Sequence, residues 1–261
     1  MGYAKSDGSA IYYEVHGSGP AVLLVHGSGG HHAAWWQQVA ALRDRYTVVT
    51  VDLRGFGNSD SSMAEFDSLE FPGDITAVLE AEDLTDVMLV GQSIGAVAAL
   101  RVALACPERI SGVVLAHSLG GLSHPELSDL VAADRAEAVK LPVIDRLLSK
   151  DFQENEKART FLFQQMGTFN VAKMADLRNL STGGPTIEEI TASGVPVCFL
   201  AGEKDAVISP ATVTRAHELL PGSLLELVPD APHSMYWEAP ELFNAAVARV
   251  RDTLTERKAH S

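Results

Sequence analysis

Short apolar runs separated by longer segments with helical spacing dominate the first half of the chain. The runs are rich in Val and Leu and lie at Ala21–His26, Tyr46–Asp52, Val87–Val90 and Val113–Ala116. Helices are predicted between them, over Ala33–Arg43, over Phe71–Glu82 and through the alanine-rich stretch that ends at Cys106. Buried strands that alternate with helices are typical of a parallel sheet with right-handed crossovers. The pattern therefore predicts an α/β fold.

The strand pattern extends to both ends of the chain. Near the start, Ile11–Val15 precedes Ala21–His26, and the turn signal Gly17–Pro20 between them predicts a hairpin. Near the end, the strand and helix pattern returns at Val195–Ala201, Ser223–Val228 and Pro240–Leu254. These segments add three more strands and a terminal helix to the predicted fold.

The segment Val87–Pro107 combines a strand, a glycine-flanked turn and a helix. Its turn, Gly91–Gly95, has the sequence Gly-Gln-Ser-Ile-Gly, and Pro107 ends the helix. Glycine on both sides keeps Cβ atoms out of a sharp bend, so Ser93 is expected in a strained conformation with its hydroxyl exposed. The free N–H groups of the helix N-terminus lie beside it and can stabilise a developing negative charge. Ser93 is therefore the candidate nucleophile.

This strand–turn–helix unit with G-x-S-x-G resembles the nucleophile elbow of the α/β-hydrolase family. A second point of resemblance is the glycine-rich turn His26–Gly30, which follows a predicted buried strand. In that family, the residue after His-Gly in this loop supplies an oxyanion N–H. The resemblance therefore implies an oxyanion hole made by the backbone N–H groups of Ser28 and Ile94. His26 is expected to be a structural residue that ties down the loop.

The resemblance also implies an acid and a base in later loops. Gly202–Pro210 resembles the family's G-x-x-D-x-x-x-P loop, which places the acid at Asp205. His233 follows the next predicted strand as the base. Ser93, Asp205 and His233 then occur in the order nucleophile, acid, base that this fold uses. In such a triad, His233 takes the proton of the serine hydroxyl and Asp205 orients the imidazole.

Three other residues are alternatives for these roles. Ser118 ends a second strand in the near-match Ala-His-Ser-Leu-Gly, but the residues that follow do not begin a helix. It therefore lacks the N–H groups of a helix end. Glu203 lies two residues before the expected acid position, and Asp230 is more simply a turn residue. The serine of the first motif and the acid of the G-x-x-D loop are preferred.

Residues 119–189 interrupt the alternation of strands and helices. They are rich in helix-forming residues, and their apolar positions recur at roughly helical spacing. The family carries a helical cap at this place, so the resemblance implies a core of residues 1–118 and 190–261 and a cap of residues 119–189. The cap is expected to roof an apolar substrate pocket. The predicted pocket residues are Gly27, Gly29, Trp35, Trp36, Leu119, Phe161 and Phe169.

The composition is that of a soluble globular protein. The chain has 261 residues, of which 46% are hydrophobic and 21% charged, and its formal net charge is -14. This acidic balance argues against nucleic acid and anionic membranes as partners. Cys106 and Cys198 form neither a disulfide framework nor a metal-ligand spacing. With no apolar signal segment at the start and no metal or cofactor motif, the sequence predicts a cytoplasmic protein that acts on a small molecule without a cofactor. The oligomeric state is left open.

A serine at the nucleophile position sets this chain apart from the family's haloalkane dehalogenases and epoxide hydrolases, which use a carboxylate there. The preferred function is hydrolysis, through an acyl-enzyme, of a small or medium ester or lactone with an apolar body. Carbon–carbon hydrolysis of meta-cleavage products is the runner-up. It shares the glycine-rich loop, but Gln92 and Ser234 replace the Asn and Trp common in that group. Perhydrolysis on the same triad and small-molecule reception without turnover are further alternatives.

Overall fold

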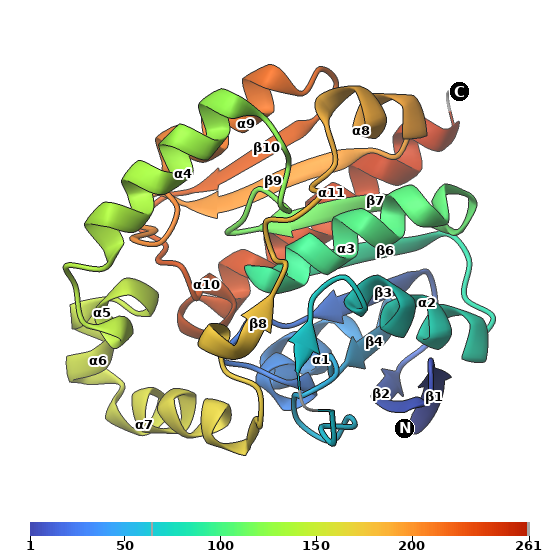
Figure 1. Cartoon of the computed structure of the whole chain (residues 1–261), viewed down its shortest axis with the longest axis horizontal. Helices are drawn as coiled ribbons and strands as arrows, with labels where there is room; N and C mark the ends of the chain where they lie inside the picture. Colours follow the sequence, from blue (N-terminus) through green and yellow to red (C-terminus); the bar gives the residue numbers. More distant parts are fainter. Residues whose placement is uncertain (64, 260–261) are drawn as a thin grey trace.

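The computed structural model describes residues 1–63 and 65–259 and contains an eight-stranded sheet with helices on both faces (Figure 1). The strands are β1 Gly2–Ser6, β2 Ser9–His16, β3 Ala21–Val25, β4 Thr47–Val51, β6 Val87–Gln92, β7 Ile110–Ala116, β9 Val197–Gly202 and β10 Leu224–Val228. Their order across the sheet is β1-β2-β4-β3-β6-β7-β9-β10. Only the pairs β1–β2 and β2–β4 are antiparallel. The predicted mostly parallel sheet is confirmed.

The helices fall into two layers because the parallel strands are joined by crossovers that return on either face of the sheet. One face packs against α2 Phe71–Ala81, α3 Ile94–Ala105, α8 Ile187–Ser193 and α9 Pro210–Leu219. The other packs against α1 Trp36–Leu42, α10 Met235–Glu238 and α11 Pro240–Ala259. In the described part of the chain, no helix is both long and apolar enough to cross a membrane.

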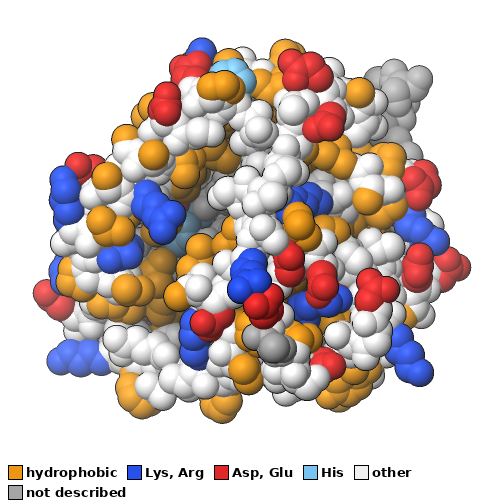
Figure 2. Space-filling view, viewed as in Figure 1, with side chains coloured by type: hydrophobic (Ala, Val, Ile, Leu, Met, Phe, Trp, Pro, Cys, Tyr) orange, Lys and Arg blue, Asp and Glu red, His pale blue; other side chains and the backbone are white. Residues whose placement is uncertain are grey.

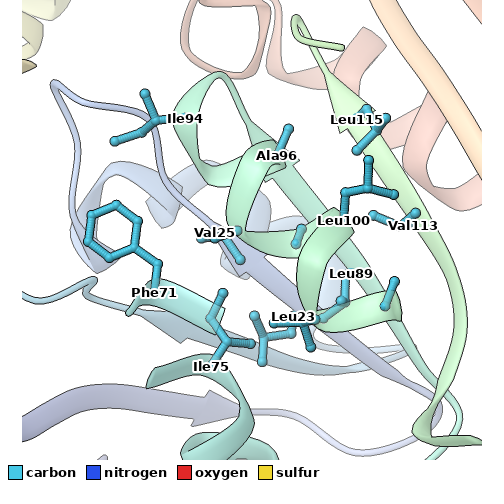
Figure 3. Close-up of a cluster of buried hydrophobic side chains, with 14 of the residues drawn as sticks. Leu23, Val25, Phe71, Ile75, Leu89, Ile94, Ala96, Leu100, Val113 and Leu115 are labelled. Atoms are coloured by element: carbon cyan, nitrogen blue, oxygen red, sulfur yellow. The ribbon is translucent and has the colours of Figure 1, made fainter. Parts of the chain in front are cut away.

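The helix α3 lies on the centre of the sheet, where the apolar strands are buried on both sides (Figure 3). Leu23, Leu89 and Val113 face each other in one row across β3, β6 and β7. Burying a side chain of this size stabilises the fold by about 1.5–3 kcal/mol. Ala96, in the first turn of α3, is fully buried and small, so the helix can approach the strand that precedes it. This packing fixes the turn between β6 and α3.

The predicted hairpin between the second and third strands is wrong. Both β2 and β3 pair with β4, which lies between them. The loop Gly17–Pro20 instead packs against the turn before β4, where side chains on Gly17 and Gly19 would collide with backbone carbonyl groups. The hairpin that does form joins β1 to β2. Its two turn residues, Asp7 and Gly8, both have positive φ, as a tight hairpin turn requires.

The segment between β7 and β9 forms an arc of helices beside the sheet (Figure 1). It contains α4 Pro125–Ala138, α5 Val143–Leu147, α6 Lys150–Asn155 and α7 Lys157–Met166, and its short strand β8 Leu177–Arg178 pairs with β5 Phe66–Asp67. Glu238 at the end of α10 accepts hydrogen bonds from the backbone N–H and the hydroxyl of Ser149 at 2.8 and 2.6 Å. The Arg159 side chain binds the Trp237 carbonyl oxygen. The arc is thus anchored on α10, while its predicted boundaries as a cap stay a prediction.

Candidate active site

Three neighbouring strands deliver polar residues to the same edge of the sheet. Gln92 at the end of β6 pairs with Ala116 at the end of β7, and Ala116 pairs with Leu200 in β9. Ser93 and His117 therefore follow equivalent positions in adjacent strands, and Asp205 lies in the loop after the third. The carboxyl edge of a parallel sheet is where α/β folds bind their ligands.

Ser93 occupies a strained turn at the end of β6. Its φ and ψ are 53° and -115°, outside the regions that L-residues prefer. Its N–H donates to the Ala116 carbonyl at 2.9 Å, which holds the turn to the next strand. A Cβ on Gly95 would collide with the carbonyl oxygen of Val25, so this position needs glycine. The glycine pattern thus correctly indicates a strained backbone at Ser93.

The Asp205 carboxylate is buried and surrounded by donors. Its oxygens lie 3.0 and 2.9 Å from Nδ1 of His233. The backbone N–H groups of Val207 and Ile208 donate to Oδ1 at 2.8 and 3.1 Å. Burial alone would raise the pKa of Asp205, but the charge interaction and hydrogen bonds with the neighbouring imidazoles outweigh it and hold the pKa well below its usual range. Asp205 is therefore ionised at neutral pH.

A narrow crevice of about 40 Å³ brings the nucleophile and base candidates together. Ser93, His233 and Ser28 all line it, and Leu147 and Phe163 from the helical arc cover it. The Ser234 N–H, directly after His233, donates to the Leu147 carbonyl at 3.0 Å. The arc is therefore attached to the loop that holds His233.

Two backbone N–H groups are available beside this crevice. α3 begins at Ile94, so the N–H of Ile94 is among the first four of a helix, which have no intrahelical acceptor. The N–H of Ser28 likewise has no acceptor among the described residues. The structure places Ser28 on the crevice wall and Ile94 directly after Ser93.

His26 ties the glycine-rich loop to the loop after β4. Its Nδ1 lies 2.8 Å from the Gly27 carbonyl oxygen, and its Nε2 accepts a hydrogen bond from the Leu53 N–H at 3.1 Å. Burial lowers the pKa of His26 to about 4, so the ring is neutral at pH 7 and keeps one donor and one acceptor nitrogen. Both nitrogens are used inside the fold, which agrees with the structural role expected for His26.

The structure also contains two larger cavities, one of which adjoins the crevice. One, of about 310 Å³, shares Gly29, Leu147 and Phe163 with the crevice and is otherwise lined by Val143, Ile144, Gln164 and Gly167. The other, of about 390 Å³, lies between α4 and the loop after β7. Figure 2 shows a hollow between the helical arc and the rest of the molecule, with hydrophobic side chains around it. The cavity that adjoins the crevice is mostly apolar.

The structure separates the predicted pocket residues into two groups. Gly27 and Gly29 line the crevice, and Leu119 lines the 390 Å³ cavity. The others are not among the residues that line these three cavities, so their place in the pocket stays a prediction; they are Trp35, Trp36, Phe161 and Phe169. Trp35 is fully buried in the core. The remaining three are 49%, 63% and 68% exposed, in the order given.

The alternative residues have other environments. Ser118 follows β7 in a chain that turns away, and the next helix begins only at Pro125, so no helix N-terminus stands behind it. Its hydroxyl oxygen accepts the Gly120 N–H at 3.2 Å. Glu203 is exposed, and Asp230 is exposed and paired with Lys204 at 2.6 Å. Neither of these two acids contacts His233 among the interactions of the described residues.

Two groups of histidine and aspartate bring possible metal-ligand atoms within 4.8 Å of one another. The first group is His31, His32 and Asp52, and the second is His117, Asp205 and His233. In each group the carboxylate already accepts hydrogen bonds from imidazole nitrogens. These bonds explain the close approach without an ion, and the expectation of no metal or cofactor stays a prediction.

The contact of His117 with Asp205 had no signal in the sequence, because it depends on strand order.

Several known proteins are similar to this chain over most of its length. A family model described as alpha/beta hydrolase fold matches residues 20–240. An esterase from Thermogutta terrifontis has a similar structure, with a TM-score of 0.81 and 24% identity over 97% of each chain. An esterase from Rhodococcus sp. ECU1013 has a TM-score of 0.75 and 26% identity over 97% of this chain and 98% of its own. A pimeloyl-[acyl-carrier protein] methyl ester esterase from Aliivibrio fischeri is 25% identical over 87% of this chain and 92% of its own.

Proposed function

Since the chain belongs to the α/β-hydrolase family and is a hydrolase, we propose that Ser93, His233 and Asp205 form its catalytic triad. The observation that supports this most directly is the crevice that Ser93 and His233 line together. His233 is in turn oriented by the ionised Asp205. A serine hydroxyl needs such a base within reach to become a nucleophile at neutral pH.

In the proposed reaction, Ser93 Oγ attacks the substrate carbonyl carbon as His233 Nε2 takes the hydroxyl proton. The carbonyl oxygen becomes an oxyanion that accepts hydrogen bonds from the N–H groups of Ser28 and Ile94. The bond to the leaving alcohol then breaks, and the alcohol leaves with the proton from His233. Water, activated by the same imidazole, attacks the acyl-enzyme and releases the acid. Asp205 stays ionised throughout and stabilises the imidazolium.

The proposed substrate is a small or medium ester or lactone with an apolar body. The support is the 310 Å³ cavity next to the crevice, whose walls include Val143, Ile144, Leu147 and Phe163. Side chains of this kind bind hydrocarbon by burying it, with few polar groups to fix its orientation. Several proteins similar to this chain are esterases by name, which agrees with an ester as substrate.

The test of the proposal is labelling with a fluorophosphonate probe. We expect the probe to react with Ser93 and to leave Ser118 free, because, of these two serines, Ser93 alone precedes a helix N-terminus and shares a crevice with His233. Peptide mass spectrometry of the labelled protein identifies the site. Ser118→Ala is the matched control and should label as the wild type does. Label that persists in Ser93→Ala would refute the assignment of the nucleophile.

The apolar cavity predicts a dependence on acyl chain length. Each buried CH₂ contributes up to about 0.8 kcal/mol, so kcat/KM should rise by up to roughly fourfold per methylene from p-nitrophenyl acetate to butyrate and fall once the cavity is full. Ile144→Phe reduces the cavity and should move the optimum to a shorter chain. Val139→Phe places the same ring on an exposed part of the arc, outside the described cavities, and should leave the optimum unchanged. A flat series in the wild type, or the same shift in both variants, would contradict the placement of the acyl group.

A further inference from the structure

The acid of the proposed triad is bonded to two histidines. Nδ1 of His117 lies 2.9 Å from Asp205 Oδ2, the oxygen that also lies 2.9 Å from Nδ1 of His233. The two rings meet edge to face, with their centroids 5.5 Å apart. A triad needs only one imidazole on its acid, so the second ring calls for an explanation.

His117 and the nucleophile occupy equivalent positions at the ends of adjacent strands. His117 follows β7 just as Ser93 follows β6, and its φ of 55° matches the 53° of Ser93. Its N–H donates to the Leu200 carbonyl at 2.7 Å, which ties it to the strand that leads to Asp205. A non-glycine residue keeps positive φ only where its surroundings impose it. The strand ends therefore fix the position of the ring against the carboxylate.

The protonation of the two rings follows from the carboxylate. An ionised carboxylate only accepts hydrogen bonds, so Nδ1 of His117 and Nδ1 of His233 must both be protonated. Burial lowers the pKa of His117 more than Asp205 raises it, so this ring is neutral at pH 7. His117 is thus a neutral donor to Asp205. It does not line the crevice that contains Ser93.

We propose, on the basis of the triad proposed above, that His117 is a positioning residue that fixes Asp205 and limits how strongly Asp205 stabilises the His233 imidazolium. A donor on Oδ2 keeps the carboxylate from rotating away from His233. The same donor takes up part of its negative charge, so the carboxylate attracts a proton on His233 less strongly. His117 thereby sets how strongly Asp205 attracts the proton that His233 takes from Ser93.

Few charged groups surround this cluster. Two titratable side chains face His117. They are Asp205, in the loop after β9, and His233, in the loop after β10. Among the described residues, the other hydrogen-bond donors to Asp205 are the uncharged N–H groups of Val207 and Ile208. A change of the pH dependence on replacing His117 can therefore be assigned to the donor that is lost.

The experiment measures the rate of fluorophosphonate labelling of the full chain against pH. His117→Phe fills the space without a donor, and His117→Gly removes the donor while suiting a positive φ. His117→Asn keeps an N–H donor near the place of Nδ1 and tolerates the same backbone. For Phe and Gly, we expect the acid limb of the rate to move to higher pH by about one unit, because the carboxylate regains its full charge. For Asn, we expect the limb to stay at the wild-type position.

The outcomes separate this inference from the function it rests on. Variants without the donor that melt cooperatively yet keep the wild-type limb would overturn the role of His117. An acid limb that moves equally in His117→Asn, His117→Phe and His117→Gly would also overturn the role of His117, because the ring would then act through packing alone. If the wild type takes no label at any pH, the proposed triad itself fails. Glycine suits the positive φ at this position, whereas phenylalanine fills the space of the ring. If one of these two variants folds poorly, the other still decides the outcome.

Discussion

Asp205→Asn is expected to lower kcat by about 10⁴ while the protein stays folded. The reason lies in the donors around the carboxylate. Val207 and Ile208 donate to Oδ1, so the amide oxygen of the new side chain takes that position. The amide NH₂ must then point at the nitrogens of His233 and His117, where Oδ2 accepted before. His233 can meet an NH₂ donor only with an unprotonated Nδ1, which puts its proton on Nε2 and removes the base from the serine.

The measurement is kcat on p-nitrophenyl butyrate, with the melting temperature recorded for each variant. Glu203→Gln and Asp230→Asn are the matched controls, since each removes one carboxylate charge near the same loop. Both side chains are exposed, and the partner of Asp230 is an exposed lysine, Lys204. We expect each control to keep kcat within about threefold, because exposed ion pairs contribute little. A loss in either control as large as that in Asp205→Asn would reassign the acid.

The parts of the fold that depend on neighbouring residues in the chain could be predicted from the sequence. The buried strands β3 and β6 are continuous apolar runs, and the glycines around Ser93 mark a bend that needs free space. Gly95, for example, has the Val25 carbonyl where a side chain would lie. Signals of this kind come from local sterics, and the resulting mostly parallel sheet is confirmed.

The parts of the fold that depend on the order of the strands in the sheet could not be predicted from the sequence. Gly17–Pro20 has turn chemistry, yet the two strands that it joins are separated in the sheet by β4, which pairs with both of them. His117 is equally invisible, since its contact with Asp205 exists only because β7 lies between β6 and β9. No spacing in the sequence encodes that adjacency.

The helical arc shows a third kind of limit. Its aromatic residues predict an apolar roof, but helical spacing alone does not say which of them face the substrate. Phe163 covers the crevice, whereas Phe161, two positions earlier and on another side of α7, is 63% exposed. Trp35 and Trp36 divide in the same way between the core and the surface. The direction of each ring is set by tertiary contacts, and for the rings of the arc by how the arc docks on α10.

Ser28→Pro is expected to lower kcat by about 10²–10³, the usual loss when one oxyanion donor is removed. Ser28 lines the crevice with Ser93, and its N–H has no acceptor among the described residues, so the group is free to bind a substrate oxygen. Proline deletes this N–H and nothing else that the reaction uses. Ser28→Ala keeps the N–H and removes only the hydroxyl, so it should keep kcat within about threefold of the wild type if the donor is the backbone.

The two variants are compared by kcat on p-nitrophenyl butyrate, by KM and by melting temperature. Because the oxyanion forms only as the carbonyl is attacked, the loss in Ser28→Pro should fall on kcat and leave KM nearly unchanged. A proline that distorts the loop would instead lower the melting temperature, since His26 and Gly27 anchor the loop to the Leu53 turn. A loss of tenfold or less in a variant that melts like the wild type would show that the oxyanion is held by other groups. An equal loss in Ser28→Ala would transfer the role from the backbone N–H to the hydroxyl.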